Sequence, residues 1–295
     1  MSTPTDLVDL QRYITLQKDI ANELDARVRR HQARIATLDE AFAEGPRPLN
    51  LLADGDSWFD YPLGGFLPGE HTDVLAQLGG MGSPPPMILS LAHWGDAATK
   101  ELGLSRRQRM VQNLLNPSNG RFDAILMSGG GDDIVGDPMP IWLNHASDVG
   151  ADPAQAIAND RFNAILDTVR ASYESLAILR TRHAPGVPTF IHDYDFAIPT
   201  GVGVCMQGPW LKPTLDYYGW TDQTVGAGIV HDMLSRFATV LRHFADTTPD
   251  VVLVRTQGTL EPSQWANELH PTPEGFKLIA AKFQVALGKI FRGRL

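Results

Sequence analysis

Five short apolar runs, separated by longer stretches with a helical pattern, constrain the fold of this 295-residue chain more than any other feature. The apolar runs cover residues 50–53, 87–92, 123–128, 187–192 and 251–255. The main helical stretches cover residues 105–115, 152–183, 224–244 and 273–291, and Asp152 with Pro153 is predicted to start the second of them. Strands that alternate with helices form a parallel sheet covered by helices. We therefore predict an α/β fold, a three-layer α/β/α arrangement around a central parallel sheet of about five strands.

A long N-terminal helix is predicted to precede this sheet. Thr3 is a suitable N-cap, Pro4 suits the first helical position, and apolar residues then recur in alternating steps of three and four from Leu7 to Phe42. This heptad pattern is typical of a coiled coil. A helix of this length measures about 55–60 Å, which is more than a small domain can cover. We expect part of the apolar seam to contact a second helix or a second copy of the chain, forming a homo-oligomer.

The sequence Gly45-Pro46-Arg47-Pro48 breaks this helix and marks a domain boundary. We expect residues 1–45 to serve packing or oligomerisation, and residues 46–295 to form the main domain. Residues 196–226 combine glycines, prolines and an aromatic cluster, so we expect a loop insertion near the functional site.

Composition excludes several classes of function. The net charge is −9 and no long Lys/Arg run offsets it, which argues against a nucleic-acid partner. No stretch of about 18 apolar residues occurs, so no membrane span is predicted. Cys205 is the only cysteine, which excludes an intramolecular disulfide and favours a reducing compartment. We expect a cytoplasmic protein.

The residues with chemical potential follow the predicted strands. Ser57 comes directly after the first apolar run, where Gly55 allows a sharp turn; Gly95 follows the second run, Asp132 the third, and His270 lies beyond the fifth. Ligands of an open α/β sheet bind at the carboxyl ends of its strands, so these residues can converge there. A serine hydroxyl is a poor nucleophile until an imidazole accepts its proton, and His270 is the candidate base. The backbone N–H groups of Ser57 and Gly95 are candidates to stabilise an oxyanion.

In these residues the chain resembles the SGNH hydrolases, also called GDSL esterases. Gly55-Asp56-Ser57 matches the family's first block, Gly95 its second, Gly130-Gly131-Asp132-Asp133 its third and His270-Pro271 the end of its last. The blocks occur in the family's order over residues 50–290. The resemblance implies an SGNH-like hydrolase domain that cleaves small-molecule carboxylic esters through a serine, without a cofactor or metal.

Two residues depart from the family's pattern. Asp132 stands where the family usually has an Asn that donates a hydrogen bond to the oxyanion, and an ionised carboxylate has no proton to donate. Asp132 can serve only if it is protonated or if the backbone does the work. A register shifted by one would instead place Gly131 at this position, although the Ile134 that follows Asp133 favours the first alignment.

The second departure concerns the acid of the triad. Asn267 stands where the family usually has an Asp three residues before the histidine, and an Asn orients the imidazole but stabilises imidazolium less than a carboxylate does. Glu268 and Asp195 are the alternative acids, and a Ser57–His270 dyad oriented by Asn267 is the favoured arrangement.

We therefore predict a serine esterase in which Ser57 forms an acyl-enzyme and His270 acts as general base. The competing hypothesis is a catalytically degenerate SGNH-fold protein that binds an acyl ligand or a partner. The sequence does not choose among acetylated sugars, short acyl esters and lysolipids. His192, Asp193 and Asp195 are candidates for metal ligands at a strand end, but satisfied polar residues at a sheet edge are the favoured interpretation because no second His pair is spaced for a site.

Overall fold

The computed structural model describes residues 4–38, 47–61, 73–95, 97–98, 103–204 and 208–294. Its centre is one five-stranded sheet in the order β2-β1-β3-β4-β5, and all four pairings are parallel. The strands are β1 (Asn50–Gly55), β2 (Met87–Ser90), β3 (Ala124–Ser128), β4 (Thr189–His192) and β5 (Val251–Val254). The predicted parallel α/β sheet is confirmed.

The strand order reverses direction at β1, because the chain runs from β1 outward to β2 and then crosses back to β3. In open parallel sheets such a switch point leaves a crevice at the carboxyl ends of the two strands that flank it. Here those strands are β1 and β3, which end at Gly55 and Ser128.

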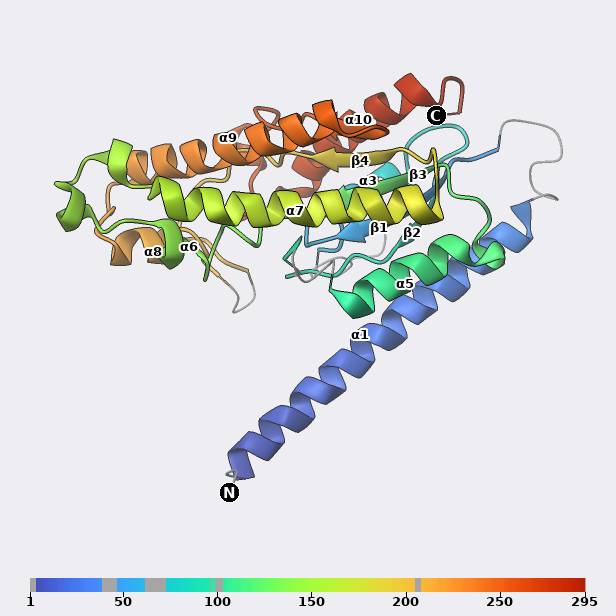
Figure 1. Cartoon of the computed structure of the whole chain (residues 1–295), viewed down its shortest axis with the longest axis horizontal. Coiled ribbons are helices and arrows are strands. Elements are labelled where there is room, and N and C mark those ends of the chain that lie inside the picture. Colours follow the sequence, from blue (N-terminus) through green and yellow to red (C-terminus); the bar gives the residue numbers. More distant parts are fainter. Residues whose placement is uncertain are drawn as a thin grey trace.

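Helices cover both faces of the sheet and complete three layers (Figure 1). In one layer, helix α7 (Asn159–His183) contacts both α5 (Leu104–Leu115) and α9 (Gln223–Thr247). Helices α3 (Val74–Leu78) and α10 (Pro273–Ile290) pack together in the other. Two short helices, α6 (Met139–Trp142) and α8 (Lys212–Tyr217), lie in the connections. Because helices cover both faces, β1 and β3 are buried along their whole length, as is typical of parallel strands.

The helix predicted over residues 152–183 starts later than expected. Asp152 caps a separate 3-10 helix, Pro153–Gln155, by accepting the Ala154 N–H at 3.0 Å, and α7 begins only at Asn159. The interruption comes from packing, because Ile157 is buried and forms an antiparallel bridge with Leu143. The predicted insertion 196–226 also holds a helix, α8, where we expected only loop.

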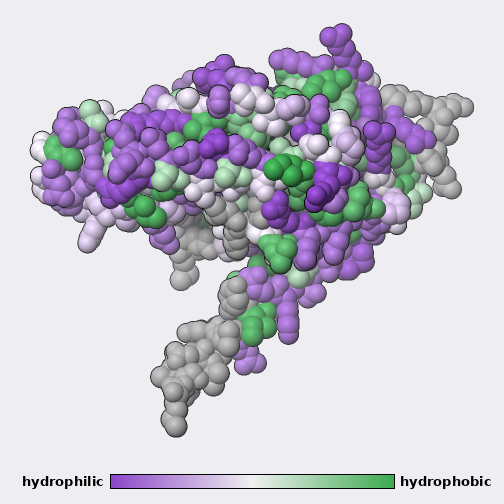
Figure 2. All heavy atoms as spheres, in the orientation of Figure 1, coloured by the Kyte–Doolittle hydropathy of each residue, from purple (hydrophilic) through white to green (hydrophobic). Residues whose placement is uncertain are grey.

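The long N-terminal helix α1 (Pro4–Ala36) is present and only partly covered by the rest of the chain. Leu24 and His31 are buried, and the Arg27 guanidinium donates to the Ala92 carbonyl at 3.0 Å and contacts Asp60 at 2.7 Å. Toward the N-terminus the helix projects from the domain (Figure 1), and Ile14 and Leu16 are 43% and 50% exposed. Hydrophobic side chains, green in Figure 2, are visible on the projecting part among hydrophilic ones.

Four sequence predictions fall on residues outside the described ranges: the Thr3 cap, the end of the heptad seam at Phe42, the helix break at Gly45-Pro46, and Cys205. None of the described helices is long and apolar enough to cross a membrane.

Candidate active site

The turn that carries Ser57 begins where β1 and β3 come into close contact. Gly55 has φ +150°, and a Cβ at this position would lie 2.3 Å from the Ser128 carbonyl oxygen. Only glycine fits such an approach. The next residue, Asp56, donates its N–H to the same Ser128 carbonyl at 3.1 Å. The chain therefore turns at the switch point and presents Ser57 at the carboxyl edge of the sheet.

Ser57 and His270 meet at this edge although 213 positions separate them in the sequence. The His270 Nε2 lies 2.7 Å from the Ser57 Oγ. On the other side of the ring, the His270 Nδ1 lies 2.9 Å from the Asn267 Oδ1. The three side chains therefore form a continuous hydrogen-bonded row: hydroxyl, imidazole and amide.

The hydrogen bonds of Asn267 determine which nitrogen of His270 carries the proton. The Asn267 Oδ1 accepts the backbone N–H groups of Leu269 and His270, both at 3.0 Å, and the Asn267 amide donates to the Tyr61 hydroxyl at 3.1 Å. Since an amide oxygen can only accept, the His270 Nδ1 is the protonated nitrogen. The lone pair of Nε2 consequently faces the Ser57 hydroxyl, which is the arrangement that a general base requires.

His270 is 5% exposed, and this burial lowers its pKa to about 3. The rings of Tyr61 and Trp210 pack beside the imidazole at 4.6 and 5.5 Å between centroids. With this pKa the imidazole is neutral at pH 7 and free to accept a proton. Its orienting partner is an amide, so the group bonded to Nδ1 supplies no negative charge to stabilise the imidazolium that forms when the proton is accepted.

The two alternative acids from the sequence do not partner His270. Glu268 and Asp195 are both buried, and each carboxylate accepts four backbone N–H groups. Those of Glu268, at 2.6–3.0 Å, come from Gly201, Trp210, Leu211 and Lys212. Those of Asp195, at 2.6–2.9 Å, come from Phe196, Gly258, Thr259 and Leu260. Both residues hold loops together, and these contacts favour Asn267 over the two alternative acids as the group that orients His270.

Ser57 and Asp132 line the same cavity, and Gly95 lines a cleft that adjoins it and that Asp132 also borders. The neighbouring Asp133 faces elsewhere, because its carboxylate accepts the Ala98 N–H at 2.6 Å. Asp132 is thus the candidate for the oxyanion hole that borders both hollows, with Ser57 in the cavity and Gly95 in the cleft. Asp132, rather than Asp133 or Gly131, is the residue whose side chain can act there.

A buried polar network that the sequence did not predict lies beneath the Ser57 turn. The Tyr194 N–H donates to the His192 Nδ1 at 3.3 Å, so the His192 Nε2–H donates to the Ser128 Oγ at 2.8 Å. Ser128 donates in turn to Asp56 at 2.7 Å, and the Tyr194 hydroxyl donates to the other Asp56 oxygen. Burial lowers the pKa of His192 to about 3 and raises the pKa of Asp56. The only sequence signal was that these polar residues end adjacent strands at the same edge.

The favoured interpretation of His192, Asp193 and Asp195 as satisfied polar residues agrees with these contacts. Asp193 accepts the Thr256 N–H at 2.7 Å, and Asp195 and His192 have the partners given above. Within the described part of the chain, no three His, Cys, Asp or Glu residues are placed to hold a metal ion.

No protein-family model matches the chain, and no curated protein matches its sequence. Solved structures do resemble it. A carbohydrate esterase family 3 structure from Talaromyces cellulolyticus is 14% identical, with a TM-score of 0.46 over 83% of this chain and 98% of that one. An extracellular lipase from Streptomyces rimosus is also 14% identical, with a TM-score of 0.47 over 81% of this chain and 99% of that one.

Proposed function

We propose that this chain is a carboxylic ester hydrolase of the SGNH type, with Ser57 as nucleophile and His270 as general base. One observation carries the proposal: the 2.7 Å contact between the Ser57 Oγ and the unprotonated Nε2 of a neutral, buried His270. A nucleophile within hydrogen-bonding reach of a base, with the base oriented by a third group, is the signature of covalent acyl transfer.

The reaction then runs in two halves. The Ser57 hydroxyl gives its proton to His270 Nε2 while Oγ attacks the ester carbonyl carbon, and the tetrahedral intermediate collapses when the carbon–oxygen bond to the alcohol breaks. The departing alkoxide takes the proton from His270 and leaves as the alcohol. In the second half, water attacks the carbonyl carbon of the acyl-enzyme while His270 takes a proton from the water. The bond between this carbon and Ser57 Oγ then breaks, the acid departs, and the proton returns from His270 to Ser57 Oγ.

The oxyanion is assigned to the backbone N–H groups of Ser57 and Gly95 and to the Asp132 carboxyl in its protonated form. These residues surround the cavity and cleft beside the nucleophile. A protonated carboxyl has one O–H to donate.

A second candidate function is a degenerate hydrolase fold that binds an acyl ligand or a partner without turning it over. Two observations favour it: the amide of Asn267 in place of a carboxylate, and a His270 pKa of about 3, which makes the imidazole a weak base. The projecting part of α1 supplies a surface for a partner.

Covalent labelling separates the two functions. We expect a fluorophosphonate to modify Ser57, and Ser57→Ala to abolish labelling and to reduce hydrolysis of p-nitrophenyl acetate by about 10³-fold or more, the scale on which serine hydrolases lose rate without their nucleophile. Ser172→Ala, in which a hydroxyl on the exposed side of α7 is removed, is the matched control and should behave as the parent. Equal rates in parent and Ser57→Ala would leave only the binding function.

We further propose that residues 46–295 form the hydrolase domain, that α1 mediates association with a second copy, and that the protein works in the cytoplasm. The exposed apolar side chains on the projecting part of α1 support the second point. The single cysteine of the sequence supports the third.

A further inference from the structure

Two hollows of different character meet beside Ser57. The first is a small cavity of about 40 Å³ that Ser57 itself lines. The second is an open cleft of about 550 Å³ that Gly95 and Trp210 line. Asp132 and Val135 border both, so the two hollows are neighbours. An ester has two parts, acid and alcohol, and each hollow can receive one of them.

The small cavity has an apolar wall. Its apolar side chains are Trp58, Val135, Ala197, Leu234, Trp265 and Leu269. Asp56 and Asp195 also border it, but their carboxylates accept hydrogen bonds from the protein. At about 10–15 Å³ for each water-sized group, the cavity holds roughly three non-hydrogen atoms. It therefore suits an acyl chain of about two to four carbons.

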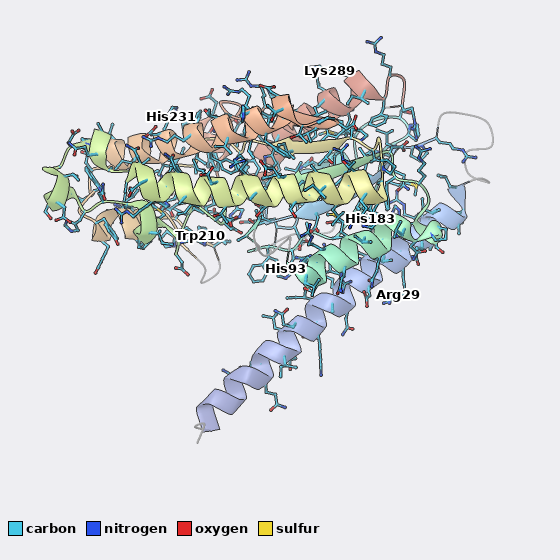
Figure 3. The ribbon with its side chains drawn as sticks, in the orientation of Figure 1. Arg29, His93, His183, Trp210, His231 and Lys289 are labelled. Carbon is cyan, nitrogen blue, oxygen red and sulfur yellow. The ribbon has the colours of Figure 1, made fainter. Side chains whose placement is uncertain are left out.

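Glu268 holds the backbone of the segment that forms one wall of the cleft. The Glu268 carboxylate accepts the N–H groups of Trp210 and Leu211 at 2.6 and 2.7 Å, which fixes the backbone that carries the indole. The Trp210 ring packs over Gly208, where a Cβ would lie 2.6 Å from it. Figure 3 shows Trp210 and His93 on the same side of the domain, below α7 in that view. An aromatic surface is thus held beside His270, with 5.5 Å between the ring centroids.

The charges of the cleft are of one sign. Among the described residues that line it, Asp132 and Asp137 are acidic and none is basic. Asp137 is exposed at the rim, where its charge acts on whatever enters. Asp132 is protonated in the proposed mechanism, so Asp137 carries the negative charge of the cleft. Its carboxylate repels an anionic alcohol, whereas the same carboxylate and the indole face of Trp210 both attract a cation.

Proton transfer determines which part of the ester occupies which hollow. The departing alcohol must take its proton from His270 Nε2, so it lies on the side of His270, where Trp210 forms the wall. The acyl group therefore occupies the apolar cavity. On the premise of the proposed ester hydrolysis, we infer that the substrate is an ester of a short carboxylic acid, of about two to four carbons, with an alcohol that carries no negative charge.

The acyl half of the inference is tested with p-nitrophenyl acetate, butyrate and octanoate, which share one alcohol. We expect kcat/KM to fall at least about tenfold between butyrate and octanoate. Leu234→Ala enlarges the cavity and should raise the octanoate-to-acetate ratio, while Leu241→Ala makes the same change at a buried α9 position that does not line the cavity and should leave the ratio unchanged. If Leu234→Ala does not fold, Ala197→Leu provides a second test. This variant narrows the cavity and should lower kcat/KM for the butyrate more than for the acetate.

The alcohol half is tested with three acetates of similar size: acetylcholine, its uncharged isostere 3,3-dimethylbutyl acetate, and 3-sulfopropyl acetate. We expect kcat/KM to decrease in that order, with differences of about fivefold per step that shrink at high salt. Asp137→Asn should reduce the differences in kcat/KM among the three acetates. Asp246→Asn, which removes an exposed carboxylate of α9 outside the cleft, should not.

The outcomes separate this inference from the proposed function. Failure to hydrolyse any p-nitrophenyl ester would overturn the proposed function itself. Ser57-dependent hydrolysis with octanoate as good a substrate as butyrate, or with the sulfonate ester as good as the neutral one, would overturn the inference and leave the proposed function intact.

Discussion

At the scale of single residues, the unusual feature of the site is an exchange of two side chains. Asp132 stands where the SGNH hydrolases that the chain resembles usually carry an amide, and Asn267 stands where they carry a carboxylate. The pair keeps one carboxyl and one amide but places each on the opposite side of Ser57 and His270. The negative charge is therefore absent where imidazolium forms, and a proton is needed where the oxyanion forms.

Restoring the carboxylate should change the pH dependence of catalysis. In Asn267→Asp the new carboxylate accepts the same N–H of His270 Nδ1 and stabilises the protonated ring, which raises the His270 pKa from its value of about 3. Activity requires the neutral ring, so the acidic limb of the kcat/KM profile should move to higher pH. At neutral pH kcat should rise about tenfold or more, because imidazolium is stabilised as it forms.

The matched control is Asn159→Asp, at an exposed position that begins α7. Its profile should superimpose on that of the parent. An acidic limb that stays in place in Asn267→Asp would show that His270 is not the group that titrates in catalysis.

The reverse change tests the other half of the exchange. Asp132→Asn provides an N–H that donates at every pH, whereas the carboxyl donates only when it is protonated. We expect kcat for p-nitrophenyl acetate at neutral pH to be retained or to rise, by up to about 10²-fold, the scale on which a single oxyanion donor acts. A large loss of kcat in a folded Asp132→Asn variant would contradict the assignment and indicate that the carboxyl itself is needed.

At the scale of elements, the strands were predictable and the start of α7 was not. Each strand is a short apolar run, because burial on both faces of a parallel sheet leaves a local pattern, and every predicted run lies within two residues of the observed strand. The Asp152-Pro153 start signal is also local, but it serves a 3-10 helix of three residues. The later start of α7 depends on the tertiary bridge between Ile157 and Leu143, which no local pattern records.

The same distinction applies to the site. Ser57 and His270 could be paired from the sequence because strand ends of a parallel sheet share an edge. The use of Glu268 and Asp195 could not be predicted, because their partners, apart from the Phe196 N–H, are backbone N–H groups more than 50 positions away. Backbone N–H groups are present at almost every residue, so the sequence does not show which of them a carboxylate will bind. From the sequence alone, an acidic residue near His270 is therefore interpreted as a catalytic candidate.

The hydrogen bonds of Asp56, Ser128 and His192 connect the ends of β1, β3 and β4. Because His192 is buried in this network, the free energy of unfolding should depend on pH. His192 has a folded pKa of about 3, below the unfolded value of about 6.5. Between these values only the unfolded chain binds the proton, so the free energy of unfolding falls as the pH drops through this window, by about 1.4 kcal/mol per pH unit. Above pH 6.5 the effect is absent.

Other groups contribute, so the measurement is a difference between variants. His270 adds the same sign, whereas Asp73, whose pKa burial raises to about 6, acts in the opposite direction as the pH falls from about 6 to 4. Urea unfolding of the parent and of His192→Gln from pH 7 to pH 5 isolates His192. The variant should show the shallower slope, and equal slopes would mean that the folded state does bind a proton at this position.

At the scale of the whole molecule, the heptad seam divides into two parts with different environments. From Leu24 to His31 the helix α1 packs on the domain, and Asp25 contacts Arg109 of α5 at 2.7 Å. Before this part the same seam continues with Ile14 exposed. The sequence predicted the seam but not its division, because the periodicity is uniform along the helix and only the position of the domain determines which turns are covered.

This division defines where α1 can be shortened without harm to the domain. Deletion of residues 1–22 removes the projecting part and keeps Leu24 and His31 in their buried places, so we expect the domain to stay folded and ester hydrolysis to be retained. If the projecting seam joins two copies, light scattering should show a dimer or larger species for the full chain and a monomer for the shortened one. In the full chain, Ile14→Glu should weaken association in the same direction, because it places a charge on the seam, while Asp19→Lys changes the charge at an exposed position on the opposite side of the helix and serves as the control. A full chain that is monomeric at all accessible concentrations would exclude self-association, and the exposed seam would then have to meet a different partner.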